Sequence, residues 1–389
     1  MEDKTLKALA AEQLDWAVAT RRALHKIPEP GFREEKTRAL IREKLAEIGV
    51  PFTDEHGWIT ALVEGARPGP VTALRADFDA LPVTEPLGCP FRSEHEGYMH
   101  ACGHDMHTAI LLATARLLMS VKNEMPGAAK LLFQPAEETV GGAKPMADAG
   151  VMDNPRVDRV YGLHVMPYLV TGQAECRPGT LNASTDTVTI EIHGVSSHGA
   201  YPDRGEDAIL CACQVVTALQ SIVSRTVSPL ESAVLTIGKI EGGRASNILC
   251  DRVTLTGTLR TANRALREKM IRRIESIARG VSEGMGQTAS VTISEGYAAL
   301  VNDDAHAERV LSAARRLLGP DAVFVKAAPS MGGEDFSYFL EKAPGAFFHL
   351  GCSPDKDHLT APLHSESFCP DEKCMEYGVL LEAALVLGQ

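Results

Sequence analysis

The chain has 389 residues, of which 44% are hydrophobic and 23% are charged, and its net charge at pH 7 is −12. This length exceeds one ordinary hydrophobic core, so two domains are expected. The negative charge argues against nucleic acid or an anionic membrane as a partner. Nine scattered cysteines, with neither an export signal nor an apolar run long enough to span a membrane, predict a cytoplasmic protein without disulfides.

The first part of the chain predicts helices followed by alternating strands and helices. The first fifty residues predict two helices that are broken at 28–31, and the second of them covers about 34–48. Short apolar runs that predict strands follow at 59–63, 71–75, 129–133 and 157–164. One long helix is expected among them, at about 105–122. This order predicts an α/β fold with a mixed, mostly parallel sheet flanked by helices.

Polar residues collect where these predicted strands end. Asp77 and Asp79 follow one strand, Glu137 and Glu138 follow a second, and His164 ends a third. Functional side chains of α/β sheets gather at the carboxyl ends of strands. These five residues can therefore meet if their strands are neighbours in the sheet.

The middle of the chain has a different order of elements. Strands are expected at 185–193, 233–240, 253–260 and 290–294, and helices at about 205–224 and 264–284. This βαββαβ order is typical of a ferredoxin-like α+β domain. The sequence thus predicts a split catalytic domain, 1–183 and 297–389, with an inserted domain at 184–296.

The stretch from His100 to His107 holds three histidines, a thiol and a carboxylate. Cys102 and His104 are two residues apart, immediately before a helix, so both could face one transition-metal ion. The positive end of the helix is expected to lower the pKa of the Cys102 thiol. We expect His107 to support the site from the next helical turn and Asp105 to orient an imidazole.

A pair of glutamates follows some thirty residues later. Glu137 and Glu138 come after an apolar strand and a Gln-Pro-Ala turn. Successive residues of an extended chain point to opposite sides, so one carboxylate could hold a metal while the other acts as a base. His164 and His364 are candidates for the missing ligands, although each alone is equally typical of a structural histidine.

Three residues of the inserted domain are candidates for binding substrate. His198, in a loop rich in glycine and proline, could donate a hydrogen bond to a developing oxyanion, or could simply lie in a turn. Asn247 follows a Gly-Gly-Arg turn. Arg260 ends a strand and could grip a carboxylate through two hydrogen bonds, or could be an ordinary surface arginine.

These motifs together resemble the aminoacylase/carboxypeptidase family of co-catalytic metallopeptidases. Within it the chain is most similar to the hippurate hydrolase and indole-acetyl-amino-acid hydrolase branch of amidohydrolases. The resemblance runs nearly end to end, and its segments in order are RRALHKIPEPGF, LRADFDALP, HACGHDMH, FQPAEE, GLHV, SSHGAYP, GGRASN, GTLR, GGEDFSYF and LHSESF.

The resemblance implies a role for each candidate. It implies metal ligands at Cys102, His104, Glu138, His164 and His364. It implies Glu137 as general base, with Asp79 as a supporting carboxylate. His198, Asn247 and Arg260 would serve the substrate, and His198 would act in its own or in the partner subunit's site. The family also implies a homodimer or higher oligomer formed through 184–296.

The expected activity is hydrolysis of an N-acyl amino acid, with two divalent ions per subunit drawn from zinc, manganese, cobalt or nickel. A dipeptidase or an aminobenzoyl-glutamate hydrolase would use the same chemistry. Two rivals are a cysteine hydrolase with Cys102 as nucleophile and a non-catalytic protein that binds metal or acylated amino acids. The segments after Asn247, Arg260 and His364 depart from the usual family pattern, which leaves the substrate preference open.

Overall fold

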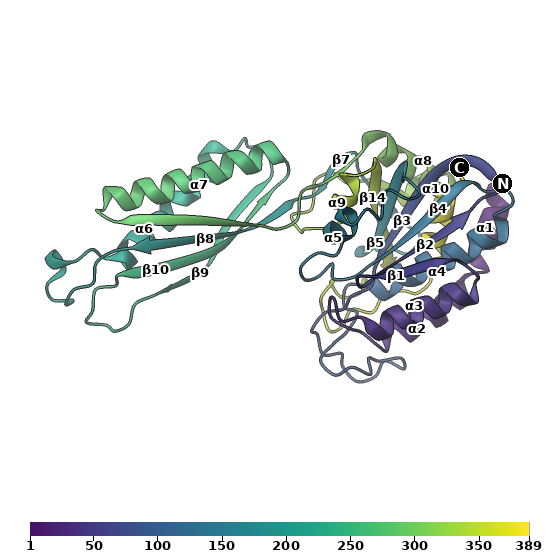
Figure 1. The fold of residues 1–389 in the computed structure, drawn as a ribbon, viewed down its shortest axis with the longest axis horizontal. Helices are drawn as coiled ribbons and strands as arrows, with labels where there is room; N and C mark the ends of the chain where they lie inside the picture. Colours follow the sequence, from purple (N-terminus) through teal and green to yellow (C-terminus); the bar gives the residue numbers. More distant parts are fainter. Residues whose placement is uncertain (389) are drawn as a thin grey trace. The chain divides into compact units, whose positions relative to one another are not determined.

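The computed structural model describes residues 1–388 and divides by internal contacts into two compact units (Figure 1). The first unit combines Met1–Leu181, Val301–Ala327 and Asp335–Gln389, and the second combines Asn182–Leu300 with Ala328–Glu334. The domain boundaries expected from the sequence, 1–183, 184–296 and 297–389, stay a prediction. The units defined by internal contacts change a few residues away from each predicted boundary. They also assign the segment Ala328–Glu334 to the second unit.

An eight-stranded mixed sheet forms the centre of the first unit. Its strands, in sheet order, are β1 (Phe52–Glu55), β2 (Trp58–Glu64), β4 (Pro126–Gln134), β3 (Arg67–Asp77), β5 (Arg159–Val170), β14 (Gly345–Ser353), β6 (Ala174–Cys176) and β13 (Val323–Val325). The pairs β4–β3, β3–β5 and β5–β14 are parallel. The strands that end at the candidate site residues are therefore neighbours, and the mostly parallel sheet is confirmed. A separate pair, β7 (Gly179–Asn182) and β12 (Leu300–Asn302), makes a two-stranded sheet.

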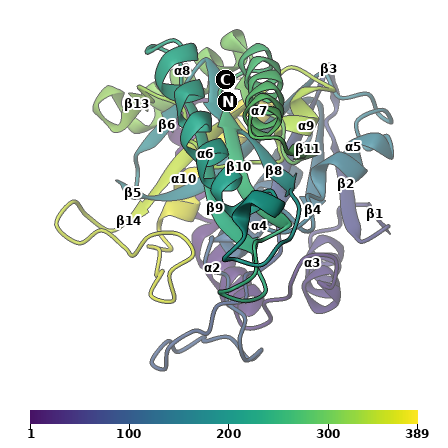
Figure 2. The same ribbon diagram turned by 90° about the vertical axis from the view of Figure 1, so that its left-hand side faces the viewer.

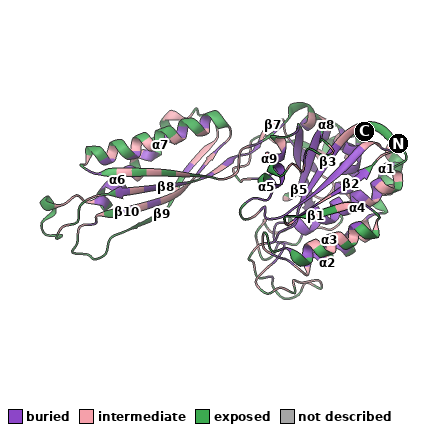
Figure 3. Cartoon of the chain, in the orientation of Figure 1, coloured by how far each residue is buried: buried purple, intermediate pink, exposed green. Residues whose placement is uncertain are grey.

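Eight helices among residues 1–388 surround this sheet, and most of its strands are buried (Figure 3). They are α1 (Asp3–Ala11), α2 (Leu14–His25), α3 (Glu35–Glu47), α4 (His104–Val121), α5 (Ala143–Asp148), α8 (Asp304–Leu318), α9 (Ser337–Leu340) and α10 (Cys374–Leu387). Of these, α3, α4, α8 and α10 contact the strands, α1 and α2 pack on α4 and α10, and α5 packs on α9. The prediction of two helices in the first fifty residues is wrong, because the first of them is interrupted between α1 and α2. At that break the side-chain amide of Gln13 donates a hydrogen bond to the backbone carbonyl of Leu9 in α1.

Glu382 is an ionisable side chain buried where α10 packs against α4. Glu382 of α10 is 2% exposed and accepts a hydrogen bond of 2.8 Å from Thr114 Oγ1 of α4. Burial raises the pKa of Glu382 from its ordinary 4.5 to about 8. Between these two values the folded protein keeps the proton while the unfolded chain loses it. Stability is therefore lost as pH rises through this range.

We expect Glu382→Gln to stabilise the protein at pH 8. Glutamine keeps the hydrogen bond from Thr114 and removes the group that must stay protonated in the core. The free energy of unfolding, measured by urea titration, should rise by about 1–3 kcal/mol at pH 8 and change little at pH 4. Glu376→Gln, on the same helix but partly exposed, is the control. Equal effects of Glu382→Gln at both pH values would contradict the argument.

The second unit has the βαββαβ order expected of a ferredoxin-like domain. Its elements are β8 (Ser184–His193), α6 (Ala208–Ser221), β9 (Ala233–Gly242), β10 (Arg252–Thr261), α7 (Arg264–Gly284) and β11 (Thr288–Glu295). The antiparallel sheet has the order β11-β8-β10-β9, and α6 and α7 lie side by side on it (Figure 2). Alternate residues of β8, such as Val188, Ile190 and Ile192, are fully buried against these helices. The opposite face of this sheet is less buried.

One helical stretch of the second unit corrects the expectation that no apolar run is long enough to span a membrane. Ala208–Thr226, which covers α6 and the π-helical residues Ile222–Thr226, contains an 18-residue window with a mean hydropathy of 1.4, and its length could span a membrane. In the structure Cys211, Val215 and Leu219 of this helix are buried in the core of the unit. Its apolar character is therefore used, at least in part, in packing onto the four-stranded sheet.

Candidate metal centre

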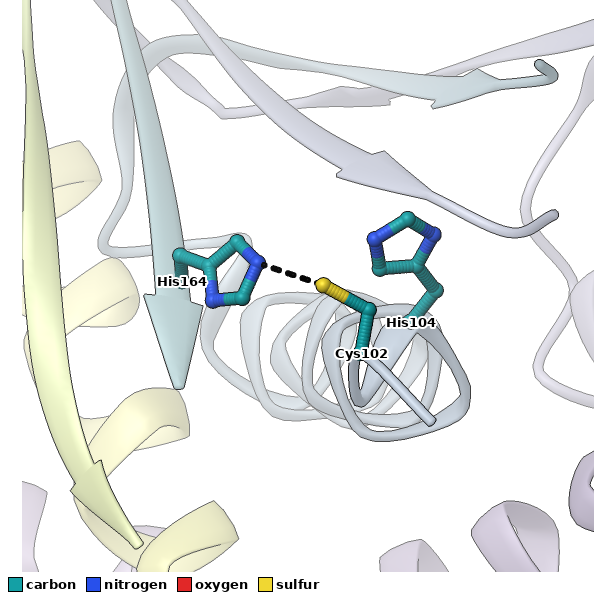
Figure 4. Close-up of side chains that lie close together, drawn as sticks. All are labelled: Cys102, His104 and His164. Atoms are coloured by element: carbon teal, nitrogen blue, oxygen red, sulfur yellow. Dashed lines mark hydrogen bonds between the residues drawn. The ribbon is translucent and has the colours of Figure 1, made fainter. Parts of the chain in front are cut away.

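The start of α4 and the end of β5 bring three potential metal ligands together. Figure 4 shows Cys102 and His104 beside the first turn of α4, with His164 reaching toward them from β5. Cys102 Sγ lies 3.3 Å from His164 Nε2. His164 Nδ1 donates to the carbonyl of Val165 at 2.7 Å, which leaves Nε2 directed at the thiol. One ligand atom from each of the three residues lies within 4.8 Å of the others.

Gly103 makes this arrangement possible. Its φ is +88°, a left-handed conformation that favours glycine, and it precedes the first residue of the helix. A Cβ at this position would lie 2.5 Å from Val165 Cγ2. The absence of a side chain therefore lets the turn at Cys102 approach β5 closely enough for the thiol to meet His164.

The two glutamates and His364 complete the group. His364 Nε2 lies 3.2 Å from Glu138 Oε1, and His104 Nε2 lies 3.8 Å from the same oxygen. Cys102, Glu138 and His364 offer atoms within 4.8 Å of one another, as do His104, Glu137 and Glu138. All five predicted ligands and the predicted base thus lie in overlapping groups within the first unit.

Two aspartates at the end of β3 orient the histidines. His104 Nδ1 donates to Asp79 Oδ1 at 3.1 Å, so Nε2 is the nitrogen left for an ion. His107 Nε2 accepts from the amide of Val165 at 3.0 Å, and its Nδ1 donates to Asp77 Oδ1 at 2.6 Å. Asp79 thus accepts from the His104 ring and Asp77 from the His107 ring, and carboxylates often orient metal-binding imidazoles in this way. The roles of Asp79 and of the candidate ligands stay predictions.

The donor set fits divalent ions of the first transition series. Thiol sulfur, imidazole nitrogen and carboxylate oxygen are the ligands that zinc and its neighbours bind. His104 Nε2 is buried and has no hydrogen-bond partner within residues 1–388. Burial lowers the pKa of His104, but the carboxylates of Asp77, Asp79 and Glu138 outweigh it and raise that pKa to about 10. A bound cation would relieve this excess of negative charge.

The pKa expected for Cys102 is wrong in direction. The sequence predicts a thiol made more acidic by the start of α4. In the structure burial, followed by the charges of Glu138 and Glu137, raises the pKa of Cys102 well above its ordinary value. The nearby carboxylates and the loss of solvent outweigh the helix terminus.

Asp105 orients a different imidazole from the one that a metal site would need. His25 Nδ1 lies 2.7 Å from Asp105 Oδ2 and His25 Nε2 lies 3.1 Å from Glu85 Oε1, while Arg21 Nε donates to the same Asp105 oxygen. These contacts tie α2 to α4. Although His25, Glu85 and Cys89 lie close enough to hold an ion, both ring nitrogens of His25 are already engaged, so hydrogen bonding accounts for this group.

The structure also contains supporting residues whose role no sequence pattern predicted. Arg75 is fully buried and donates to Asp77 Oδ2 at 2.7 Å and to Asp335 Oδ1 at 2.9 Å. Gln134 Nε2 donates to both oxygens of Asp335 at 2.8 Å. Arg75 therefore forms buried ion pairs with two acids, and these pairs fix the end of β3, with Asp77, against the segment that holds Asp335. The only sequence signal is the position of Arg75 and Asp335 within motifs of the family resemblance.

The three substrate-binding candidates lie in the second unit. His198 and Asn247 belong to adjacent loops, since the amide of Gly199 donates to the carbonyl of Asn247 at 2.8 Å and His198 pairs with Ile248. Both are exposed. Arg260 is half-buried on β10, paired with Thr185 of β8. Their roles stay predictions.

Comparisons with known proteins agree with this geometry. The model of Peptidase family M20/M25/M40 matches residues 73–387. The chain is 40% identical to an N-acetyl-L-cysteine deacetylase of Bacillus subtilis over 91% of this chain and 83% of the relative. It is 38% identical to thermostable carboxypeptidase 1 of Saccharolobus solfataricus over 98% and 97% of the two chains.

A solved structure supports the same assignment. The YXEP protein of Bacillus subtilis, described as a dinuclear metal binding peptidase of the M20 family, superposes with a TM-score of 0.84 at 32% identity, covering 98% of both chains. A family match over most of the chain and full-length relatives above 30% identity show the family. The chain therefore belongs to Peptidase family M20/M25/M40 and is a metal-dependent hydrolase that acts on amide bonds.

Proposed function

We propose that this protein hydrolyses the amide bond of N-acyl amino acids, of the N-acetyl or hippurate type, to a carboxylic acid and a free amino acid. The observation that carries this is the carboxylate of Glu137 beside His104 and Glu138, in a cluster of metal-binding side chains. A pure binding protein has no use for such a base. The deacetylase name of a relative at 40% identity supports the N-acyl class.

We propose two divalent ions per subunit, held by Cys102, His104, Glu138, His164 and His364. The overlap of the three ligand groups supports two adjacent ions, and the description of the YXEP relative as dinuclear agrees. Bound there, the ions would lower the pKa of bound water to about 7 and polarise the substrate carbonyl. Zinc, manganese, cobalt and nickel all suit these ligands, and availability often selects among them.

Each remaining residue has a separate task in this proposal. Glu137 takes a proton from the attacking water and passes it to the leaving nitrogen. Asp79 keeps the His104 ring turned so that Nε2 faces the ligand group. His198 donates to the oxygen on which charge develops, a contact worth about 3–4 kcal/mol when it comes from a fixed donor. Asn247 adds a polar contact to the substrate, and His198 acts in its own or in the partner subunit's site.

Arg260 is proposed to bind the α-carboxylate of the substrate, which sets the position of the amide. We expect Arg260→Ala to lower kcat/KM for an N-acetyl amino acid by about 10–100-fold, chiefly through KM, because a charge-assisted hydrogen bond contributes roughly 1.5–3 kcal/mol. The corresponding carboxamide should lose much less. Steady-state kinetics on the matched acid and amide measure the difference.

Arg252→Ala is the matched control for Arg260. Arg252 begins the same strand, β10, and forms an exposed ion pair with Glu191. Its loss should leave the kinetics unchanged. If Arg260→Ala weakens the acid and the carboxamide equally, the carboxylate contact is wrong.

A substrate panel tests the proposed function itself. Purified protein, loaded in turn with each of the four metals, is assayed with N-acetyl amino acids, hippurate, dipeptides and aminobenzoyl-glutamate, and the released amine is quantified. The proposal expects the highest kcat/KM among the N-acyl amino acids. Preference for a dipeptide or for aminobenzoyl-glutamate would replace it with the alternative activities, and no turnover with any metal would favour the binding protein.

We propose a small-molecule substrate as the main partner and a homodimer or higher oligomer formed through 184–296, in the cytoplasm. The second unit exposes large apolar side chains, among them Ile209, Leu210, Leu230 and Ile240. Exposed apolar surface often marks a protein–protein contact. A monomer in sedimentation equilibrium at concentrations well above those of the assay would contradict the oligomer.

A further inference from the structure

The turn that carries Glu137 and Glu138 has a constrained backbone. Ala136 is fully buried and has a φ of +58°, a left-handed conformation that is unfavourable for a residue with a side chain. Such a conformation persists only where the surroundings hold it. Gly31 lies against this turn, and a Cβ at Gly31 would come within 2.8 Å of Ala136 Cβ. The loop before α3 is therefore packed directly onto the turn.

Two buried carboxylates hold the backbone on either side of Glu137. The amide of Ala136 donates to Glu34 Oε1 at 3.0 Å, and the amide of Glu138 donates to Asp79 Oδ2 at 2.9 Å. Glu34 is 2% exposed and Asp79 is 1% exposed. Hydrogen bonds from backbone amides to carboxylates are stronger than those between neutral groups. Glu137 thus lies between two anchored peptide units, one of which is held from the loop before α3.

We propose that Glu34 is a positioning residue that sets the direction of the Glu137 carboxylate by holding the left-handed conformation of Ala136. The inference rests on the proposed function, in which Glu137 is the general base. Glu34 Oε1 accepts from the amide of Ala136 in the turn, so Glu34 acts on Glu137 through the backbone.

The charge environment agrees with a residue held for its geometry. Burial raises the pKa of Glu34 to about 7, and the nearby charge of Asp79 adds to this rise, although backbone hydrogen bonds from Ala136 and Phe32 oppose it. Burying a carboxyl group beside another acid is unfavourable. An apolar residue in this place would avoid that cost but could not accept the hydrogen bond from Ala136.

Three substitutions at Glu34 separate position from charge. Glu34→Ala removes the acceptor, Glu34→Asp keeps the charge on a shorter side chain, and Glu34→Gln keeps an acceptor oxygen at the same reach without the charge. A misplacement of about 1 Å in a catalytic group can lower the rate about 100-fold. We expect Glu34→Ala and Glu34→Asp to lower kcat by about this factor with little change in KM or metal content, and Glu34→Gln to recover most of it.

Glu29→Ala is the matched control. Glu29 is a buried carboxylate in the same loop, but its Oε2 accepts from the amide and hydroxyl of Thr37, at 2.9 and 3.0 Å, and so it supports α3 instead of the turn. Its loss should reduce stability and leave kcat unchanged. If Glu29→Ala lowers kcat as much as Glu34→Ala does, general destabilisation explains both and the inference is overturned.

Hydrogen exchange provides a readout that does not depend on turnover. Removal of the acceptor should speed exchange of the Ala136 amide about tenfold in Glu34→Ala, while Glu34→Gln should stay close to the parent protein. Unchanged exchange together with unchanged kcat in Glu34→Ala and Glu34→Asp would overturn the role of Glu34. If Glu137→Gln keeps full activity, the proposed base fails instead, whatever the Glu34 variants do.

Discussion

Glu137→Gln is expected to lose nearly all turnover while the protein keeps its metal. Glutamine has the same shape but cannot take a proton from water or return it to the leaving nitrogen. General acid–base catalysis contributes about 10²–10⁴-fold, so kcat should fall by that range with a small change in KM. Steady-state kinetics on an N-acetyl amino acid, with metal analysis of the same sample, measure both quantities.

Glu138→Gln is the matched comparison. The two carboxylates are adjacent in sequence, but Glu138 Oε1 is the oxygen that faces His364 and His104, at 3.2 and 3.8 Å. Its substitution should lower metal content as well as activity. If Glu137→Gln instead loses metal while Glu138→Gln retains it, the roles of ligand and base must be exchanged. An unchanged kcat in Glu137→Gln would remove this residue from catalysis.

Complete removal of divalent metal is expected to abolish activity, and readdition of zinc, manganese, cobalt or nickel to restore it. The reason is that the potential ligand atoms of Cys102, His104 and His164 lie close together. Within residues 1–388, His104 Nε2 is also buried without a hydrogen-bond partner, so it is available to bind an ion. Dialysis against a chelator, followed by assay with each metal, gives the result. Activity should fall by at least about 100-fold, since the ions activate water and stabilise charge together.

The same experiment separates the metal mechanism from a thiol nucleophile. The pair of Cys102 Sγ and His164 Nε2, 3.3 Å apart, has the geometry that a cysteine hydrolase also requires. Activity that survives full metal removal and is then lost on alkylation would favour the thiol. Cys213→Ser, which changes an exposed cysteine of the second unit, is the control for general thiol effects.

Local sequence patterns predicted much of the site. Cys102 and His104 lie two residues apart beside a glycine, so short-range geometry alone brings them to one side of the turn. Glu137 and Glu138 are neighbours at a strand end, which directs chemistry to that loop. The alternation of strands with helices was enough to predict the sheet, and the βαββαβ order was enough to predict the ferredoxin-like unit.

The tertiary structure decided which distant residues meet. His164 and His364 have no local feature that separates a ligand from a structural histidine, and only the fold brings them to Cys102 and Glu138. The Arg75–Asp335 pair joins positions 260 residues apart, and no pattern in either segment predicts a partner at that separation.

Local features of the sequence were enough to predict a metal-dependent hydrolase built on an α/β sheet, with a separate α+β unit. That follows because motif spacing and hydrophobic periodicity depend on interactions between near neighbours in the chain. Only the tertiary structure decided that the pKa of the Cys102 thiol is raised and that Asp105 pairs with His25. The same is true of the hydrogen bond from the amide of Ala136 to Glu34. Each of these depends on desolvation or on contacts between remote segments, which exist only once the core has closed.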